Sequence, residues 1–466
     1  MRTPLSNVDA SWLRMDDPTN LMVVNGVLVL DEVLPLERFR ELLRDRLVHF
    51  DRFRSRVVPA PAGIGPPSWE IDPDFSLDRH LVEARVPEPG DEAALQAFVS
   101  GLLSQPLDPD RPLWRFHFVP RYQGGSAVVT RIHHCVGDGL ALVHVLLSMA
   151  DGAVAAPSPP PPAAAPEEEE HGSFFDAVGA TLERTRDAAR AVSGRVLREA
   201  RELLAHPERI ARSGKDVATH LGSLARLLAL PPDPKSAFKG PLAVQKRAAW
   251  SRAFELEDFK AVSRATGSTV NDVLMAALAG GLRRYLLGRG EVAAGLDVRG
   301  VVPVNLRPPS EAHLLGNRFG LVFLELPLGV EDALDRLFEI RRRMRAIKES
   351  PEAAAIFEVL WAVGVVPKAV FDLVLAIFAT KATAVVTNVA GPRQRISIAG
   401  VPLRQCMFWV PSAGHLGLGV SLLSYAGKVW LGVQSDANLV PDPDRILAGF
   451  EREIEALQEL RREAAS

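Results

Sequence analysis

The sequence predicts an α/β protein built from two halves of similar size that are joined by a linker. The chain has 466 residues, which is long enough for two or three domains. Strand-like and helical patterns alternate over residues 1–151 and again over residues 239–466. The stretch between them is rich in proline and glutamate and cannot bury a core. We therefore expect domains over 1–151 and 239–466, with a linker and bridging helices over 152–238.

In the first half, residues 21–30 predict a strand, because they are rich in β-branched side chains and are bounded by polar ones. Residues 35–48 carry apolar side chains at helical spacing and predict a helix. A Gly-Gly turn at 124–125 separates two further apolar runs and predicts a hairpin. The hairpin strands are expected over 113–119 and 126–132, and a helix is expected over 140–149.

The predicted linker begins with alanines and prolines over residues 153–166 and continues with a glutamate run over residues 167–170. Such a composition predicts an exposed segment without a packed core. Two arginine-rich helices are expected after it, over 174–204 and 207–230. These helices either bridge the two halves or are partly mobile, and the pattern does not decide between the two.

In the second half, residues 270–287 give the strongest helical pattern. Further helices are expected where apolar residues recur at amphipathic spacing, over 331–347 and 443–462. Short apolar runs rich in valine and leucine predict strands over 298–304, 321–326, 384–388 and 428–435.

The composition is that of a globular protein, with 47% hydrophobic and 24% charged residues. Lysine and arginine number 54 against 57 acidic residues, so the net charge of -3 gives no electrostatic reason to expect a nucleic-acid partner. The two cysteines, Cys135 and Cys406, are too few for a disulfide framework and too far apart for a zinc cluster.

No segment of the sequence predicts a membrane span. Lys368, Asp372 and Lys381 interrupt the most apolar region, residues 359–389. Its longest uninterrupted run, residues 360–367, is shorter than the ~20 residues that a spanning helix needs. The first residues also lack the apolar run of a signal peptide. We expect a cytoplasmic protein.

One pair of histidines is adjacent among the 11 in the chain, and it stands out by its position. His133 and His134 follow a predicted strand, and Asp138 and Gly139 lead into a predicted helix. Side chains at a strand-to-helix turn are held by rigid elements yet can face a cleft. Because neighbouring side chains of an extended segment point to opposite sides, one histidine can face the cleft while the other packs behind it.

Several interpretations of these residues remain open at this point. An adjacent histidine pair also arises by chance, and imidazole and carboxylate can both bind a metal. Neighbouring strand residues diverge, however, and no second ligand cluster completes a site, so we expect no metal. Asp138 can cap the helix that follows it. Asn271 and Asp272 fit a plain helix N-terminus, and Cys135 and Trp114 fit packing roles.

The string H-H-x-x-x-D-G at 133–139 resembles the active-site motif of CoA-dependent acyltransferases and of the condensation domains of peptide synthetases. Further segments narrow the resemblance, and they run in order from Pro4 to the last predicted helix. Together they are similar to the bacterial wax ester synthase/diacylglycerol acyltransferase family. The matching residues are 4–6 with Asp9, Pro18 and Met22, followed by the segments 112–114, 269–273, 302–307, 316–320, 387–392 and 424–429.

This resemblance implies two chloramphenicol-acetyltransferase-like domains, each a mixed sheet flanked by helices. It implies transfer of a long-chain fatty acyl group from acyl-CoA to a hydroxyl acceptor, either diacylglycerol or a long-chain alcohol. Acyl-CoA is then a substrate, and no cofactor is expected. The family's catalytic base matches His134, while His133 shapes the pocket. The superfamily holds the aspartate at Asp138 with an arginine, for which Arg307 is the candidate.

The resemblance also assigns roles outside the histidine turn. Asn271 is expected to donate a hydrogen bond to the oxyanion of the tetrahedral intermediate or to orient His134. Glycine at 137 and 139 leaves room for close approach of the substrate. The residues expected to line the CoA and acyl channels are Gly137, Gly139, Asn317, Arg318, Asn388 and Gly391.

Two features depart from the family pattern, namely the insertion after Asp151 and a lysine at Lys239. Rival functions are a condensation-type or plant-type acyltransferase and a catalytically idle lipid-binding protein of lipid droplets.

Peripheral contact with the inner membrane or with lipid droplets is expected through the arginine-rich segment 184–226 or the apolar stretch 357–382. The oligomeric state is not predicted.

Overall fold

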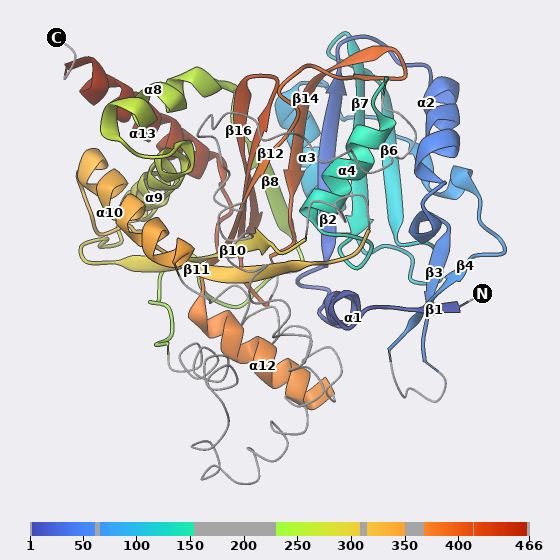
Figure 1. Cartoon of the computed structure of the whole chain (residues 1–466), viewed down its shortest axis with the longest axis horizontal. Coiled ribbons are helices and arrows are strands. Elements are labelled where there is room, and N and C mark those ends of the chain that lie inside the picture. Colours follow the sequence, from blue (N-terminus) through green and yellow to red (C-terminus); the bar gives the residue numbers. More distant parts are fainter. Residues whose placement is uncertain are drawn as a thin grey trace, which may run out of the picture.

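The computed structural model describes residues 2–60, 66–152, 230–307, 315–349, 368–412 and 414–463. Strands of two mixed sheets fill the centre of the molecule, with α8, α9, α10 and α13 on one side and α2 on the opposite side (Figure 1). The predicted linker over 153–166 and the predicted helix over 174–204 lie outside the described residues, as does the predicted helix over 207–230 apart from its last residue.

The first sheet has the strand order β13-β14-β2-β7-β6-β5. Its centre is formed by the predicted strand and hairpin of the first half. β7 pairs antiparallel with both β2 and β6, and β6 pairs parallel with β5. The bounds of these strands are Val23–Leu30 for β2, Leu81–Glu83 for β5, Trp114–Tyr122 for β6 and Gly125–His133 for β7.

Two strands from the second half of the chain complete this first sheet. β13 (Ser397–Ile398) and β14 (Val401–Trp409) follow β12 in sequence, yet β14 pairs antiparallel with β2. The boundary at residue 239 therefore does not coincide with the boundary between the two sheets, because the first sheet contains strands from both halves of the chain. A strand's partner depends on distant residues, and the local pattern of 401–409 does not reveal it.

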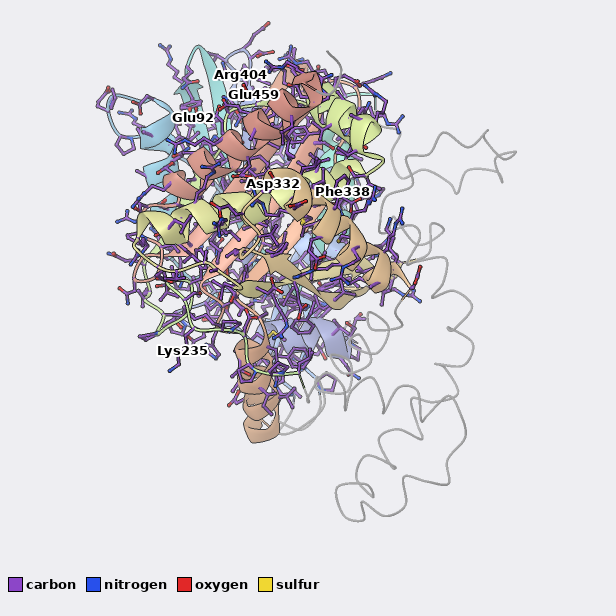
Figure 2. All side chains as sticks on the ribbon, turned by 90° about the vertical axis from the view of Figure 1, so that its left-hand side faces the viewer. Glu92, Lys235, Asp332, Phe338, Arg404 and Glu459 are labelled. Atoms are coloured by element: carbon purple, nitrogen blue, oxygen red, sulfur yellow. The ribbon has the colours of Figure 1, made fainter. Side chains whose placement is uncertain are left out.

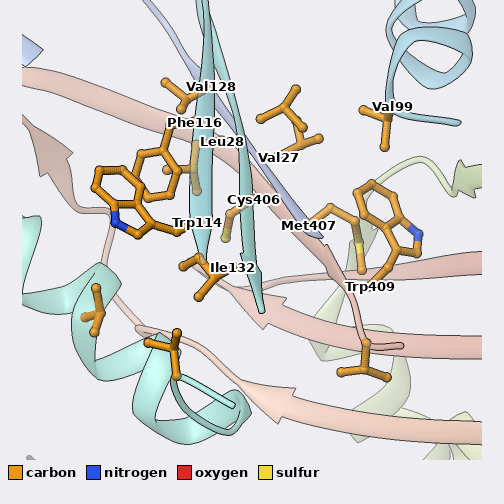
Figure 3. Close-up of a cluster of buried hydrophobic side chains, with 14 of the residues drawn as sticks. Val27, Leu28, Val99, Trp114, Phe116, Val128, Ile132, Cys406, Met407 and Trp409 are labelled. Atoms are coloured by element: carbon orange, nitrogen blue, oxygen red, sulfur yellow. The ribbon is translucent and has the colours of Figure 1, made fainter. Parts of the chain in front are cut away.

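The side chains of these central strands form one apolar core (Figure 3). Met407 and Trp409 of β14 lie beside Val27 of β2, and Val99 approaches from α3. Trp409 is fully buried. Burial of this apolar surface stabilises the exchange of β14 into the first sheet.

Helices of the first half support the sheet and the turn that follows β7. α1 (Asn7–Arg14) precedes β2, and α2 (Leu36–Leu42) continues as the π-helical turn η1 (Leu43–Leu47), so that together they confirm the predicted helix over 35–48. The predicted helix after the histidines is α4 (Gly139–Met149). The remaining elements are η2 (Asp51–Phe53), η4 (Leu77–Arg79), α3 (Glu92–Leu103) and a small sheet of β1 (Arg2–Pro4), β4 (Ser68–Ile71) and β3 (Ser55–Val58).

The second sheet has the order β11-β10-β12-β15-β16-β8, and β9 pairs with β16. β12 runs parallel to both β10 and β15, while the other pairs are antiparallel. The carboxyl ends of β10 and β12 therefore lie at the same edge. The bounds are Lys246–Trp250 (β8), Phe254–Glu255 (β9), Asp297–Asn305 (β10), Phe319–Pro327 (β11), Ala384–Ala390 (β12), Leu418–Tyr425 (β15) and Lys428–Asp436 (β16).

α8, α10 and α13 pack around α9, which is buried along most of its length. Close packing needs glycine at Gly281, because a Cβ there would lie 2.9 Å from the backbone nitrogen of Phe450. Asp332, which caps α10, and Phe338 lie on the outer face (Figure 2). The bounds are Leu256–Thr266 (α8), Val270–Gly288 (α9), Ala333–Lys348 (α10), Lys368–Lys381 (α12) and Asp444–Glu463 (α13).

Direct hydrogen bonds also join the two halves. Ser100 Oγ on α3 accepts from the backbone nitrogen of Ala248 on β8 at 2.9 Å, and Ser104 Oγ accepts from that of Lys246 at 3.0 Å. α3 thus connects the first half to an edge of the second sheet. Among the described helices, none combines the length and apolar character that a membrane span requires.

Candidate active site

The two histidines lie where β7 ends and the chain turns into α4. The backbone nitrogen of His133 donates to the carbonyl of Leu113 at 2.9 Å, and that of His134 donates to the carbonyl of Met22 at 2.7 Å. The turn is therefore anchored at both sides of β7, next to the starts of β6 and β2. Both side chains are buried, as a preformed site requires.

His133 packs with a defined tautomer. Its Nδ1 accepts a hydrogen bond from the backbone nitrogen of Cys135 at 3.1 Å, so the neutral ring carries its proton on Nε2. That Nε2 lies 3.7 Å from Oδ1 of Asp16. The hydrogen bond from Cys135 holds the ring against the turn, while the buried Nε2 makes no hydrogen bond among the described residues.

His134 lies among aromatic rings. The indole of Trp12 on α1 stacks on its imidazole with a centroid distance of 4.0 Å and an interplanar angle of 15°. Phe319 of β11 lies 5.8 Å away and is tilted by 51°. Burial lowers the pKa of His134 to about 4, although the nearby carboxylate of Asp138 partly offsets this shift. The ring is therefore neutral at pH 7, in the form that can accept a proton.

Asp138 connects the histidine turn to the second half. Its Oδ1 accepts from the backbone nitrogen of Ala141 at 2.9 Å, which confirms the predicted helix cap. Its Oδ2 accepts from Nη2 of Arg307 at 2.9 Å and from the backbone nitrogen of Arg318 at 3.0 Å. The predicted arginine partner is thus confirmed, and the ion pair is buried.

Asn317 lies in the same buried network. Its side-chain nitrogen donates to the carbonyl of His134 at 2.7 Å and to Oδ1 of Asp9 at 2.8 Å. Oδ2 of Asp9 pairs with Nη2 of Arg52 at 3.0 Å. We predicted Asn317 as a channel residue, and here its amide holds the backbone of the histidine turn.

Arg52 is a further support of the turn. Its Nη1 donates to the carbonyls of Cys135 and Val136, both at 3.0 Å. We did not assign a role to Arg52 or to Trp12. Asp9 was identified only as a residue that matches the family, without a role. The sequence signal for this region is Ser6, whose side chain accepts from the backbone nitrogen of Asp9 at 3.0 Å and so begins α1.

Asn271 is the second residue of α9, at the carboxyl edge of the second sheet. Thr269 and Asp272 form the capping box, so the expected helix start is confirmed. Asn271 Oδ1 accepts from the side-chain nitrogen of Asn388 on β12 at 2.8 Å. The structure pairs these two asparagines, and Asn271 makes no hydrogen bond to His134.

The glycines near the site differ in their surroundings. Gly137 forms an isolated parallel bridge with Gly316, and a Cβ at Gly137 would lie 3.1 Å from that of Ala141. At Gly139, a Cβ would meet open space. A Cβ at Gly391 would lie 2.6 Å from the backbone oxygen of Ser424, so this position needs glycine for strand contact.

The comparisons with known proteins begin with two family matches. Residues 5–274 match the wax ester synthase/diacylglycerol acyltransferase catalytic domain. This chain belongs to the wax ester synthase/diacylglycerol acyltransferase family. Residues 315–458 match the C-terminal domain of the same family. The family that the sequence motifs indicated is therefore confirmed.

Similar proteins cover nearly the whole chain of this family member. It is 28% identical to a probable diacylglycerol O-acyltransferase, tgs1, of Mycobacterium tuberculosis over 97% of this chain and 95% of the relative. A wax ester synthase/diacylglycerol acyltransferase structure from Marinobacter aquaeolei is 22% identical, with a TM-score of 0.67 over 98% of this chain and 99% of that one.

A condensation domain of the calcium-dependent antibiotic synthetase has the same fold, with a TM-score of 0.61, 17% identity and coverage of 100% of this chain and 97% of that one. The two-domain, chloramphenicol-acetyltransferase-like architecture is therefore confirmed for this family member.

Two further kinds of site were considered in the described part of the chain, namely a metal centre and a cysteine nucleophile. No three His, Cys, Asp or Glu side chains there lie close enough to hold a metal ion. Burial raises the pKa of the Cys135 thiol well above its usual value, so it is no thiolate nucleophile.

A surface pocket on α10 is lined in part by arginines. Two of them already have partners within the protein, because Arg341 donates to the carbonyl of Thr266 and Arg342 pairs with Glu339.

Proposed function

We propose that this chain is an acyl-CoA-dependent O-acyltransferase that moves a long-chain fatty acyl group to a hydroxyl acceptor. Family membership supports the reaction class, and the names of its relatives point to diacylglycerol as acceptor. The observation that carries the proposal is the neutral, buried imidazole of His134, held at a strand-to-helix turn between the two halves. A long-chain alcohol is the second acceptor class, giving wax ester in place of triacylglycerol.

The proposed reaction is a direct transfer in a ternary complex. An alcohol is a weak nucleophile, so His134 removes the hydroxyl proton as the oxygen attacks the thioester carbonyl. The C–S bond of the tetrahedral intermediate then breaks, and the imidazolium returns the proton to the CoA thiolate. The products are the ester and free CoA, and the histidine ends neutral. No covalent acyl-enzyme forms, which fits the inert state of Cys135.

Asn271 is the proposed donor to the oxyanion. Its Oδ1 already accepts from Asn388, which leaves its two N–H groups to donate. Asn388 would then orient the donor, in addition to its expected place in the channel. A preorganised donor of this kind stabilises the charge that develops during attack.

The remaining channel residues are kept as proposals with different supports. Gly139 fits a lining role, because the space where a Cβ would lie is open. Gly137, Asn317, Arg318 and Gly391 would act chiefly by allowing or holding the backbone arrangement around the substrates.

The first experiment measures free CoA with a thiol reagent. Purified protein is incubated with palmitoyl-CoA and, in turn, diacylglycerol, hexadecanol or no acceptor. We expect CoA release that depends on the acceptor. Failure of every hydroxyl acceptor to support release by folded protein would overturn the proposal and favour an idle lipid-binding protein.

Contact with a lipid surface is a second proposal, because the substrates and products are poorly soluble. Of the two segments expected to contact lipid, 184–226 lies outside the described residues, as does the first part of 357–382. The rest of the second segment forms α12, which is apolar and lies beneath β11 (Figure 1). Lys381 cannot supply the cationic contact that we expected, since it is buried and its Nζ donates to the carbonyl of Leu230. Binding through α12 should therefore resist salt.

Flotation with anionic liposomes at low and high salt tests this second proposal. Binding that persists at high salt supports α12. Binding that salt removes assigns the contact to exposed charged residues instead, and absence of flotation at either salt concentration rejects surface contact.

A further inference from the structure

Three rings from separate parts of the chain meet at the histidine turn. Trp12 comes from α1, His134 from the turn after β7, and Phe319 from β11 in the second half. The indole and the imidazole are nearly parallel at 4.0 Å, which is direct stacking contact. Phe319 lies 5.8 Å from both of the other rings. Only 5% of Trp12 and 5% of His134 is exposed to solvent.

The helix that carries Trp12 is itself bound to the site. Asp9 precedes Trp12 by three residues, so the two side chains lie on the same face of α1. Asp9 is 1% exposed and accepts from both the backbone and the side-chain nitrogen of Asn317, which in turn holds the carbonyl of His134. The same helix therefore carries the indole and, through Asp9 and Asn317, holds the backbone of His134.

We propose that Trp12 is a positioning residue for His134, whose indole fixes the plane of the imidazole and keeps water from that face. This inference rests on the proposed function, in which His134 is the base. A flat aromatic surface restricts the tilt of a ring stacked on it. It also offers no hydrogen bond from its face that would compete with the substrate hydroxyl.

Loss of Trp12 should change the pKa of His134 mainly through hydration, because the charged groups near the histidine stay in place. Asp138 and His133, from its own turn, are the titratable groups that act on its charge. Around the turn, Arg52 of η2 pairs with Asp9 of α1, and Arg307, after the end of β10, pairs with Asp138. Each of these groups is held in hydrogen bonds that do not involve Trp12. Removing the indole therefore admits water without removing a charge, and the pKa of His134 should rise toward its unperturbed value of about 6.5.

Trp12 offers a second chemical group, and the variants must separate it from stacking. Nε1 of Trp12 is buried and has no hydrogen-bond partner among the described residues. Trp12→Phe keeps an aromatic face but removes this N–H, whereas Trp12→Ala removes both. Stacking predicts that Phe preserves function, while a donor role of Nε1 predicts that Phe and Ala are equally impaired.

The test is the pH dependence of kcat/KM for palmitoyl-CoA with a hydroxyl acceptor. We expect wild type and Trp12→Phe to keep a flat acid side down to pH 5. Trp12→Ala should be about tenfold less active at pH 5 than at pH 7.5, because most of a histidine with a pKa near 6 is protonated there. An unshifted profile in Trp12→Ala, or equal losses in Phe and Ala, overturns the inference.

A matched control comes from the other tryptophan–histidine stack. Trp114 lies 4.6 Å from His80 at an angle of 18°, and both are buried. Trp114→Ala, the same change as in the perturbing variant Trp12→Ala, should lower the melting temperature without moving the acid limb of kcat/KM. A shift of that limb in Trp114→Ala would show that general loosening of the fold explains the effect, and would overturn the specific role of Trp12.

A readout independent of turnover separates this inference from the proposed function. ¹⁵N-histidine NMR follows the His134 signal, assigned by its loss in His134→Gln. We expect titration near pH 4 in wild type and above pH 5.5 in Trp12→Ala. The same NMR shift in a protein that transfers no acyl group would refute the proposed function alone. Unchanged titration would refute the role of Trp12.

Discussion

Both carboxylate oxygens of Asp138 accept hydrogen bonds from other parts of the chain. Oδ1 caps α4, and Oδ2 binds Arg307 together with the backbone of Arg318. The carboxylate thus connects a turn of the first half to two segments of the second. At the scale of single residues, the polar groups of this site act mainly on backbone, and His134 is left as the group that reacts.

Replacing Asp138 by alanine should destabilise the protein. The lost cap costs about 0.5–2 kcal/mol, and breaking the buried ion pair with Arg307 costs about 3–5 kcal/mol. Asp138→Asn keeps the cap and should lose less. Urea unfolding of the three proteins measures the difference, and a loss below about 1 kcal/mol in Asp138→Ala would contradict the structural role.

His134→Ala should abolish most turnover while the protein stays folded. Loss of a general base typically lowers the rate by about 10²–10⁴. The exposed His49, replaced by alanine, is the control for loss of a histidine elsewhere. CoA release and circular dichroism are measured together. If folded His134→Ala retains wild-type turnover, the base must be reassigned, with His133 next.

Prediction at the residue scale succeeded where the partners are close in sequence or carried by a motif. The cap by Asp138 follows from its place before a helix, and Arg307 follows from the family resemblance. The roles of Trp12 and Arg52 were not predicted, because their contacts join α1 and η2 to residues more than 80 positions away. No local pattern encodes such a distance.

At the scale of elements, long segments with a clear period were predictable, whereas several short helices and some strands were not. α9, α10 and α13 match their predicted ranges closely, as do β10, β11, β12 and β16. α1 was missed because it is short and buries the polar residues Asp9 and Ser11, which hide its apolar face. α3, α8, β14 and β15 were not predicted, and neither was the pairing of β14 with β2.

Contact between α9 and α13 gives a prediction at this scale. Gly281→Ala should destabilise the protein by about 1–3 kcal/mol, because the new methyl group would meet the backbone of α13. Gly101 in α3 is the matched control, since a Cβ there meets nothing within 4 Å. Gly101→Ala should be neutral or stabilising by about 0.5–1 kcal/mol. Thermal melts measure both, and equal effects would contradict the packing argument.

At the scale of the whole molecule, burial of histidines sets its response to acid. Burial lowers the pKa of His80, and it lowers the pKa of His117 and of His134 to about 4. These residues are neutral in the folded protein but titrate near 6.5 when unfolded. The unfolded chain therefore binds more protons below that pH, and acid favours unfolding.

We accordingly expect full stability above pH 6.5 and a progressive loss as the pH falls from about 6.5 to about 4. Urea midpoints at pH 7.5, 6 and 5 should decrease in that order. His117→Phe should flatten the decrease, because it removes one of the titrating groups. A midpoint that stays constant or rises toward pH 5 would contradict this assignment.

The insertion of β14 between β13 and β2 has a consequence for how the protein is made. β2 emerges early from the ribosome, but the strand that pairs with its free edge is formed by Val401–Trp409. Until those residues are synthesised, the nascent first half exposes an unpaired edge, which is a template for association with other chains. We therefore expect this edge to stay unpaired through most of translation, and the histidine turn to gain its supports Arg307 and Asn317 only after the first half has been made.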